Sequence, residues 1–164
     1  MGRAQILQFT SHSAPAPGVG EVLLAQRGCN LQVEVGTASA FVASPEERRS
    51  LVVWAHLDTG ASQTTISLRL AAQLGLTQIG VVSSHTAGGR VTNPTYAIDL
   101  AFVGATLAPR IDLHVGSCVL PFDPARHVAA PNDATNFGVL LGRDVMSTWH
   151  IAWDGPSSMV FITE

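Results

Sequence analysis

The residues with the clearest capacity for chemistry are Asp58-Thr59-Gly60, which follow the short apolar segment Leu51 to Leu57. A carboxylate at the end of a buried strand needs hydrogen bonds or a nearby charge to compensate for lost hydration. Gly60 lets neighbouring groups approach that carboxylate closely. Hydroxyl groups follow at Thr59, Ser62 and Thr64. An isolated Asp-Thr-Gly is most often a simple turn, but its place between an apolar strand and a helix indicates a functional carboxylate.

Size and composition favour one globular domain that binds neither nucleic acid nor a membrane. The chain has 164 residues, 46% of them apolar, which is enough for a real core. The net charge is −3, and the nine basic residues are arginines without a basic stripe. No basic region followed by an apolar stretch predicts a signal peptide, and no run of about 18 apolar residues predicts a membrane span. We therefore expect a soluble, cytoplasmic chain, unless it was cut from a longer parent.

The two cysteines and six histidines show no spacing typical of a metal site. Cys29 and Cys118 are expected to be reduced thiols, although a pairing between them stays open. His56, two residues before Asp58, is interpreted as a hydrogen-bonded strand histidine rather than a catalytic base. We expect no metal and no cofactor.

Strand patterns dominate the chain, so the fold class is predicted to be mainly β with one or two short helices. The predicted strands are Gln5–Phe9, Glu21–Ala25, Leu31–Val35, Phe41–Ala43, Leu51–Leu57, Val81–Ser84, Arg90–Thr92, Tyr96–Val103, Ile111–Val115, Val139–Gly142, His150–Trp153 and Met159–Thr163.

Helices are predicted at Ser67–Leu74, with Ser67 as cap and Gly75 as terminator, and at Asp144–Trp149. Pro121 to Gly138 is predicted to be a long surface loop, and Ala87-Gly88-Gly89 the tip of a hairpin. Residues 1–20 contain a first strand and a Ser/Pro/Gly-rich segment, and residues 21–164 form the main domain.

The order of these features resembles the retropepsin-like aspartic proteases, the single-domain, retroviral-type branch with cellular relatives. The resemblance covers roughly residues 21 to 163. It rests on Asp58-Thr59-Gly60-Ala61-Ser62, the following helix, the glycine-containing hairpin and the closing segment Leu140-Leu141-Gly142-Arg143-Asp144. It implies a closed, barrel-like acid-protease fold that functions as a two-fold dimer.

The resemblance further implies an endopeptidase whose active site is shared by two identical subunits. Asp154-Gly155 lacks the intervening hydroxyl residue, so each chain supplies one Asp58 to a dyad that activates water for attack on a peptide or protein substrate. Neither a metal nor a cofactor is required for this chemistry. A catalytically silent dimerisation or peptide-binding module of the same fold is the alternative.

The family pattern also assigns roles to individual positions. Active-site support is implied for Thr59, Gly60, Ala61 and Ser62, and a substrate-binding flap for Ala87, Gly88 and Gly89. The structural motif under the active site comprises Leu140, Leu141, Gly142 and Arg143. The terminal strands Gln5–Phe9 and Met159–Thr163 are implied to interleave in the dimer.

Two departures from the family pattern affect the expected chemistry. Ser62 replaces an aspartate that pairs with the arginine in several retroviral enzymes, so the partner of Arg143 stays open. Ala61 lacks the hydroxyl that pepsin-type enzymes place directly after Asp-Thr-Gly to stabilise the ionised carboxylate. We therefore expect a pH optimum less acidic than that of pepsin.

Overall fold

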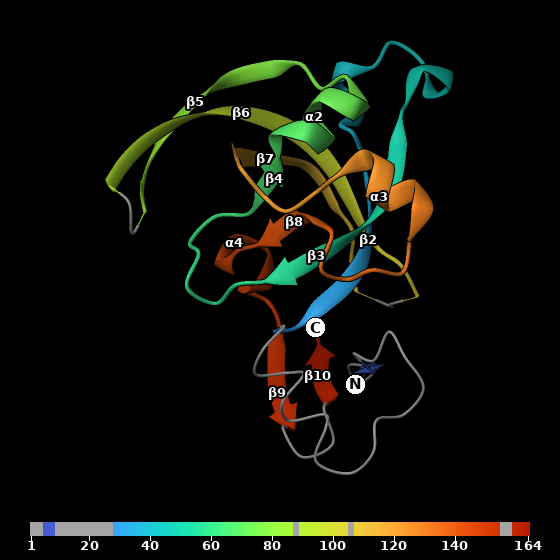
Figure 1. The fold of residues 1–164 in the computed structure, drawn as a ribbon, viewed down its shortest axis with the longest axis vertical. Helices are drawn as coiled ribbons and strands as arrows, with labels where there is room; N and C mark the ends of the chain where they lie inside the picture. Colours follow the sequence, from blue (N-terminus) through green and yellow to red (C-terminus); the bar gives the residue numbers. More distant parts are fainter. Residues whose placement is uncertain (1–4, 9–27, 87–88, 105–106, 155–158) are drawn as a thin grey trace.

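A computed structural model describes residues 5–8, 28–86, 89–104, 107–154 and 159–164 (Figure 1). The strand expected at Glu21–Ala25 and the expected flap residues Ala87 and Gly88 lie outside these residues. Within them, no helix is long and apolar enough to cross a membrane.

Six strands close into a barrel that holds most of the core. Their order around the barrel is β2, β3, β8, β4, β7 and β6, and antiparallel pairing of β2 with β6 completes the circle. Closure leaves no open edge among these six strands. Their bounds are β2 Asn30–Thr37, β3 Ser50–Leu57, β4 Thr65–Ser67, β6 Gly89–Phe102, β7 Arg110–Cys118 and β8 Phe137–Leu141.

Alternating side chains of these strands fill the barrel, as the two-residue period of a strand requires. Val33 and Val35 of β2 are fully buried, whereas Glu34 between them is exposed. Val53 and Ala55 of β3 point into the same core. The apolar end of β3 therefore places Asp58 where the chain leaves the barrel.

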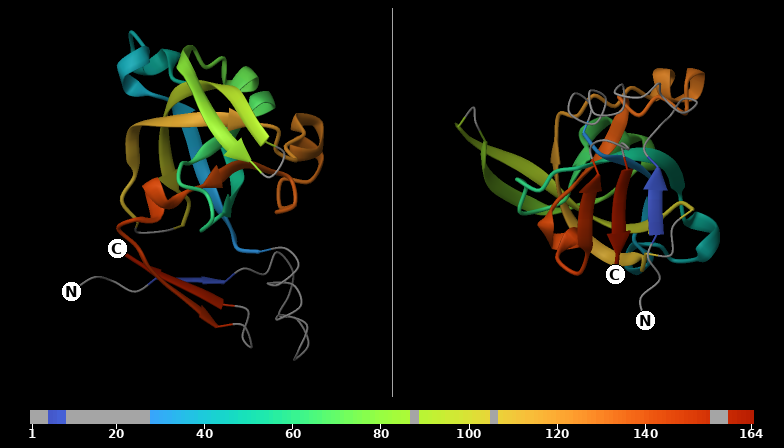
Figure 2. Two further views of the ribbon diagram at one scale, coloured as in Figure 1. Left: turned by 90° about the vertical axis from the view of Figure 1, so that its left-hand side faces the viewer. Right: turned by 90° about the horizontal axis from the view of Figure 1, so that it is seen from below.

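The strand β5 (Gln78–Thr86) pairs with β6 alone and forms a long hairpin with it. This hairpin extends away from the barrel, and it lies on the same side of the molecule as the loop that follows β3 (Figures 1 and 2).

In the described part of the chain, three short α-helices lie outside the barrel: α2 (Leu68–Leu74), α3 (Pro124–Ala129) and α4 (Arg143–Met146). The helix α2 confirms the cap and the terminator that were predicted from the sequence. Ser67 caps α2 by accepting a 3.3 Å hydrogen bond from the amide of Arg69, and Gly75 ends it with φ +66°. The helix is held to the core by the buried side chains of Leu70 and Leu74.

A separate three-stranded sheet has the order β1 (Gln5–Gln8), β10 (Met159–Thr163) and β9 (His150–Asp154) (Figure 2). The terminal strands thus pair with each other within one chain. An ion pair of 2.7 Å between Arg110 and Glu164 links the end of β10 to the barrel. Hydrogen bonds from Arg110, Ala108 and Thr148 lower the pKa of Glu164 to about 2.

Several predicted elements are wrong or incomplete. Phe41–Ala43 is not a strand, because residues 39–41 form the 3-10 helix η1 (Ser39–Phe41), followed by η2 (Pro45–Glu47). The two strands predicted within residues 90–103 are one continuous strand, β6. The expected loop Pro121–Gly138 contains α3 and the start of β8. The short strand β4 was not predicted, because its pairing partners β7 and β8 are distant in sequence.

Candidate active site

The loop that carries Asp58 begins at a fixed point in the barrel. Strands β3 and β8 run parallel, and the amide of Asp58 donates a 3.0 Å hydrogen bond to the carbonyl of Leu141. Leu57 and Leu141 are both buried, so this end of the two strands is anchored in the core. The backbone leading to the carboxylate is therefore fixed by packing and by strand pairing.

Backbone amides support the half-buried carboxylate of Asp58. Its Oδ1 accepts hydrogen bonds from the amide of Gly60 at 2.8 Å and from the amide of Ala61 at 3.2 Å. A side chain at position 60 would place its Cβ 3.0 Å from the same oxygen, which is closer than ordinary contact. Glycine at this position therefore allows the turn to fold back onto the carboxylate. Thr59 and Gly60 themselves are exposed.

The start of α4 holds the other side of this turn. Arg143 donates from Nη1 to the carbonyls of Thr59 at 2.8 Å and Gly60 at 3.1 Å. Its own amide donates to the carbonyl of Ala61 at 3.0 Å, and the amide of Asp144 donates to that of Ser62 at 3.3 Å. The partner of Arg143, left open by the sequence, is thus the backbone of the Asp-Thr-Gly turn.

A buried hydrogen-bond network around Thr64 joins the loop to α4. Thr64 is fully buried, and its hydroxyl accepts from the amide of Gly142 at 3.0 Å and donates to Asp144 at 2.7 Å. The carboxylate of Asp144 also accepts from the amide of Thr64 at 2.9 Å. Sequence reasoning noted Thr64 only as a nearby hydroxyl and gave Asp144 no role. The sequence signal for Asp144 was its place in the first turn of α4, where a carboxylate can accept hydrogen bonds from backbone amides.

Gly142 is positioned by close packing against the same loop. A Cβ at this position would lie 2.4 Å from the carbonyl carbon of Gln63 and 2.7 Å from the amide of Thr64. These are backbone atoms, so the clash could not be relieved by a side-chain rotation. Leu141 lies fully buried beneath the turn and Leu140 is half-buried. The segment Leu140-Leu141-Gly142 therefore contacts this loop through Gly142 and bonds to the amide of Asp58 through the carbonyl of Leu141.

His56 has ordinary partners in the neighbouring strands β2 and β8. Its ring stacks on Phe137 at a centroid distance of 5.1 Å, and its Nδ1 lies 2.9 Å from Oδ1 of Asn30. Burial lowers the pKa of His56, and the negative charge of Asp58 acts in the opposite direction. The histidine therefore forms part of the supporting structure two residues before the carboxylate.

Other groups singled out in the sequence contribute little to this site. Cys29 is buried and Cys118 half-buried; both are free thiols whose pKa values are raised by burial. In the described part of the chain, no group of three or more His, Cys, Asp or Glu residues could hold a metal ion. Of the expected flap residues, only Gly89 is described, at the start of β6 with φ +109°.

Comparison with known sequence families gives a clear assignment. Residues 49–145, which include both the Asp-Thr-Gly turn and the Gly142-Arg143-Asp144 segment, match the family described as aspartyl protease. The chain belongs to the aspartyl protease family. No curated protein sequence shows significant similarity to it.

A solved structure that matches nearly the whole length confirms the retropepsin-like fold of this aspartyl protease chain. The retropepsin-like aspartic protease of Rickettsia conorii is 10% identical with a TM-score of 0.51, and the match covers 99% of this chain and 94% of that one. The foamy viral protease-reverse transcriptase is 15% identical with a TM-score of 0.40, covering 73% of this chain and 12% of that one. The retroviral protease-like domain of Ddi1 from Leishmania major is 16% identical with a TM-score of 0.35, covering 76% and 80%.

Proposed function

We propose that this chain is an aspartic endopeptidase whose active site forms when two copies associate and bring Asp58 beside the partner's Asp58. The observation that carries the proposal is the supported carboxylate. Asp58 is held by two amides, on a turn clamped by Arg143, beside a long hairpin. Within the described residues, each chain has a single Asp-Thr-Gly turn, so a two-carboxylate site requires a second chain.

The chemistry follows from two carboxyl groups that share one proton. Both cannot ionise easily at close range, so one is a carboxylate and the other a carboxylic acid. The carboxylate removes a proton from a water molecule as its oxygen attacks the scissile carbonyl, and the acid donates its proton to the carbonyl oxygen. Collapse of the tetrahedral intermediate breaks the C–N bond, and a proton passes to the leaving nitrogen.

Two surfaces are suited to the association of the subunits. Thr59 is exposed beside Asp58, so its hydroxyl is free to bond to the opposite turn in a two-fold arrangement. In the described part of the small sheet, β1 and β9 each pair along one edge only, which leaves backbone groups for a second copy. Only residues 147–149 separate α4 from β9, so the surface offered by the sheet is tied closely to the turn.

The hairpin β5–β6 is proposed as the flap that covers the bound peptide. It lies on the same side as the loop of Asp58 in two views at right angles (Figures 1 and 2). Closure of such a hairpin would exclude water from the reacting groups and strengthen their electrostatic interactions. A Cβ built on Gly89, at the start of β6, would have no heavy atom within 4 Å.

Subunit mixing tests the shared active site directly. Purified wild-type protein is mixed with increasing amounts of the Asp58→Asn variant, and cleavage of a broad peptide library is followed by mass spectrometry. If both subunits must supply Asp58, equal amounts leave about one quarter of the dimers active, whereas independent monomers retain about half of the activity per chain. Sedimentation analysis of the same mixtures gives the oligomeric state.

The alternative of a silent binding module predicts a different result. Wild-type protein would then cleave no library peptide between acidic and neutral pH, although it would still form dimers. Peptide binding by wild type and Asp58→Asn would be equal in that case. Cleavage by wild type that is lost in Asp58→Asn, with dimerisation intact, would exclude this alternative.

A further inference from the structure

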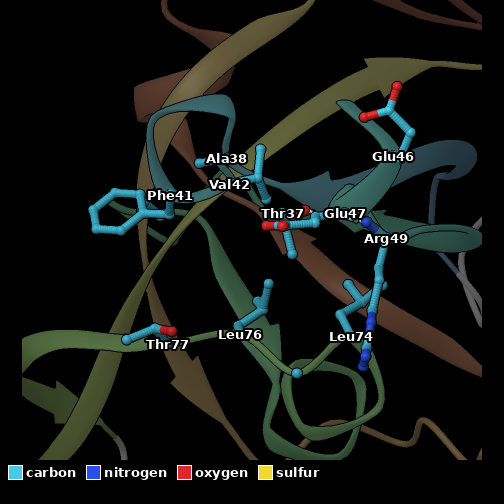
Figure 3. Close-up of a pocket in the computed structure, with 12 residues that line it drawn as sticks. Thr37, Ala38, Phe41, Val42, Glu46, Glu47, Arg49, Leu74, Leu76 and Thr77 are labelled. Carbon is cyan, nitrogen blue, oxygen red and sulfur yellow. Dashed lines mark hydrogen bonds between the residues drawn. The ribbon is translucent and has the colours of Figure 1, made fainter. Parts of the chain in front are cut away.

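A pocket lies away from the Asp58 turn, between the segment that joins β2 to β3 and the end of α2 (Figure 3). Its volume is about 470 Å³, which is within the roughly 300–1,000 Å³ range of sites for small organic ligands. None of residues 58–62 lines it. Its walls are formed by Thr37, Ala38, Phe41, Val42, Glu46, Glu47, Arg49, Leu74, Gly75, Leu76, Thr77 and Ala97.

Apolar side chains form part of the pocket wall. Ala38, Leu74 and Ala97 are buried beneath it, and Val42 and Leu76 are partly exposed towards it. Phe41 stands at one side of the opening with 54% of its surface exposed (Figure 3). A ligand that covered these side chains would gain the free energy of removing apolar surface from water.

The carboxylates of Glu46 and Glu47 lie at the rim of the pocket and already accept hydrogen bonds within the turn that carries them. Glu47 accepts a 3.2 Å hydrogen bond from the amide of Ala43 through Oε2. A hydrogen bond from Ser44 lowers the pKa of Glu46, which is fully exposed. Both groups therefore help to hold η2 in place. Their negative charges also disfavour ligands that carry several carboxylates.

Arg49, on the side opposite Phe41, is the charged group available to a ligand (Figure 3). Its backbone is fixed, because its amide donates to Thr37 Oγ1 at 3.2 Å and its carbonyl accepts from the amide of Thr37 at 2.9 Å. Among the described residues, its guanidinium has no carboxylate partner, whereas the neighbouring Arg48 pairs with Asp99 at 3.3 Å.

The guanidinium of Arg49 lies over the end of α2. A Cβ on Gly75 would be 3.1 Å from its Nη1. The nearby carbonyls of Ala71 and Ala72 already accept from the amides of Leu76 and Gly75, so the helix end does not use the donors of Arg49. A planar guanidinium with free donors beside an apolar floor is suited to a carboxylate attached to an apolar group.

We infer that this pocket binds the C-terminus of a peptide that ends in an aliphatic residue. Arg49 receives the terminal carboxylate, and the last side chain covers Val42, Leu74 and Leu76. The inference rests on the proposed function only for the source of such a ligand, because an endopeptidase generates new peptide C-termini when it cleaves. The pocket and its charge are independent of the Asp58 chemistry.

The test uses the full chain with Asp58→Asn, so that no peptide is hydrolysed and binding is measured whether or not the wild type is a protease. The probes are acetyl-Ala-Ala-Leu with a free carboxylate and the same peptide with a C-terminal amide, titrated by calorimetry. We expect the acid to bind at least about tenfold more tightly than the amide. Amide resonances of Gly75 and Leu76, rather than Gly60, should shift in nuclear magnetic resonance spectra.

Three comparisons locate the interaction. Adding Arg49→Gln should reduce the acid-to-amide ratio to about one, whereas the matched control Arg69→Gln, an exposed arginine on α2, should leave it unchanged. Acetyl-Ala-Ala-Gly should bind several-fold more weakly than the leucine peptide because it leaves the apolar floor uncovered. 4-Methylpentanoate, which has a similar end without peptide bonds, should bind more weakly than the peptide.

Four results would overturn the inference. These are no binding of the leucine peptide at millimolar concentration, equal affinities for acid and amide, a preference that survives Arg49→Gln, and equal affinity for 4-methylpentanoate. The last would assign the pocket to small carboxylates instead of peptide ends.

Discussion

Arg143 bonds to the carbonyl of Thr59, at 2.8 Å, although the two residues lie 84 positions apart in the sequence. A second bond to the carbonyl of Gly60 uses the same nitrogen. The arginine thus orients two successive peptide groups of the turn. It does not pair with a carboxylate. Since Ser62 is an uncharged residue, this backbone contact explains how the chain retains a use for the arginine without the aspartate of its retroviral relatives.

Replacing Arg143 with lysine should impair cleavage more than folding. Lysine keeps the charge but replaces the rigid guanidinium with a flexible ammonium group, so the two bonds made by Nη1 are no longer held in one geometry and the turn loses its fixed orientation. We expect kcat/KM to fall on the order of tenfold to a hundredfold, because small misplacements of catalytic groups are costly. Peptide cleavage and thermal unfolding are measured together. The matched control is Arg126→Lys, which alters the ion pair between Arg126 of α3 and Asp133 and should cleave normally. Equal activity of the two variants would contradict this role.

Thr64→Val should destabilise the fold by about 1–3 kcal/mol, because it leaves the buried amide of Gly142 without an acceptor. Valine has nearly the same shape as threonine, so the loss of stability measures the contribution of the hydroxyl group and not the cost of a cavity. Thr64→Ser keeps the hydroxyl and should recover most of the stability lost on replacement with valine. Urea unfolding of the three proteins gives the free energies. A valine variant as stable as the serine variant would show that the hydroxyl contributes nothing.

Gly142→Ala should also destabilise the protein, by about 1–3 kcal/mol or more, because the new methyl group meets the backbone of residues 63 and 64. The conformation itself is not the cause, since φ is −94°. Gly80→Ala is the control, because its closest contact is the hydroxyl of Thr95, the end of a side chain. Urea midpoints of the two variants are compared with that of wild type. A smaller loss for Gly142→Ala than for Gly80→Ala would refute the steric explanation.

Elements with local signals could be predicted from the sequence. The helix α2 has its cap at Ser67 and its terminator at Gly75, both adjacent to it, and the apolar run of β3 marks where Asp58 leaves the core. The mainly β fold class follows from many such local patterns. The retropepsin-like barrel was predicted from the resemblance of two motifs in the right order.

Features that depend on distant contacts could not be predicted. The three-residue strand β4 has too few residues for a periodic pattern, and its partners β7 and β8 are far along the chain. Thr64 and Asp144 lie 80 positions apart, so no spacing reveals that they bond. The pairing of β1 with β10 within one chain likewise needed the structure, since these strands lie at opposite ends of the sequence and the family resemblance concerned only their arrangement in a dimer.

Ala61→Ser should shift the pH optimum of cleavage to lower pH. The amide of Ala61 already donates to Asp58 Oδ1 at 3.2 Å, and a hydroxyl at this position would add a donor near the same carboxylate. Hydrogen bonds to the charged form favour ionisation, so the ionised member of the dyad would persist to more acidic conditions. The measurement is kcat/KM across the pH range for wild type and variant. Ala61→Val adds bulk without a donor and controls for steric effects. Superimposable profiles for wild type and the serine variant would refute the prediction.

His56→Gln should make the fold less sensitive to acid. Burial lowers the pKa of His56 below its ordinary value of 6.5. The unfolded chain therefore binds a proton more readily than the folded chain, so stability is complete above pH 6.5 and falls as the pH drops through this value towards the folded pKa. Wild type should lose stability as the pH falls through 6.5, and the glutamine variant should lose less.

Urea unfolding of wild type and His56→Gln at several pH values across this window measures the difference. Glutamine retains a donor that can reach Asn30, so the comparison isolates the titration from the hydrogen bond. His114→Gln alters an exposed histidine of β7 and should follow the wild-type pH dependence. Parallel stability curves for wild type and His56→Gln would mean that His56 is as easily protonated in the folded chain as in the unfolded one. A stability difference that shifts in favour of His56→Gln as the pH falls would instead assign part of the acid sensitivity of the fold to this histidine.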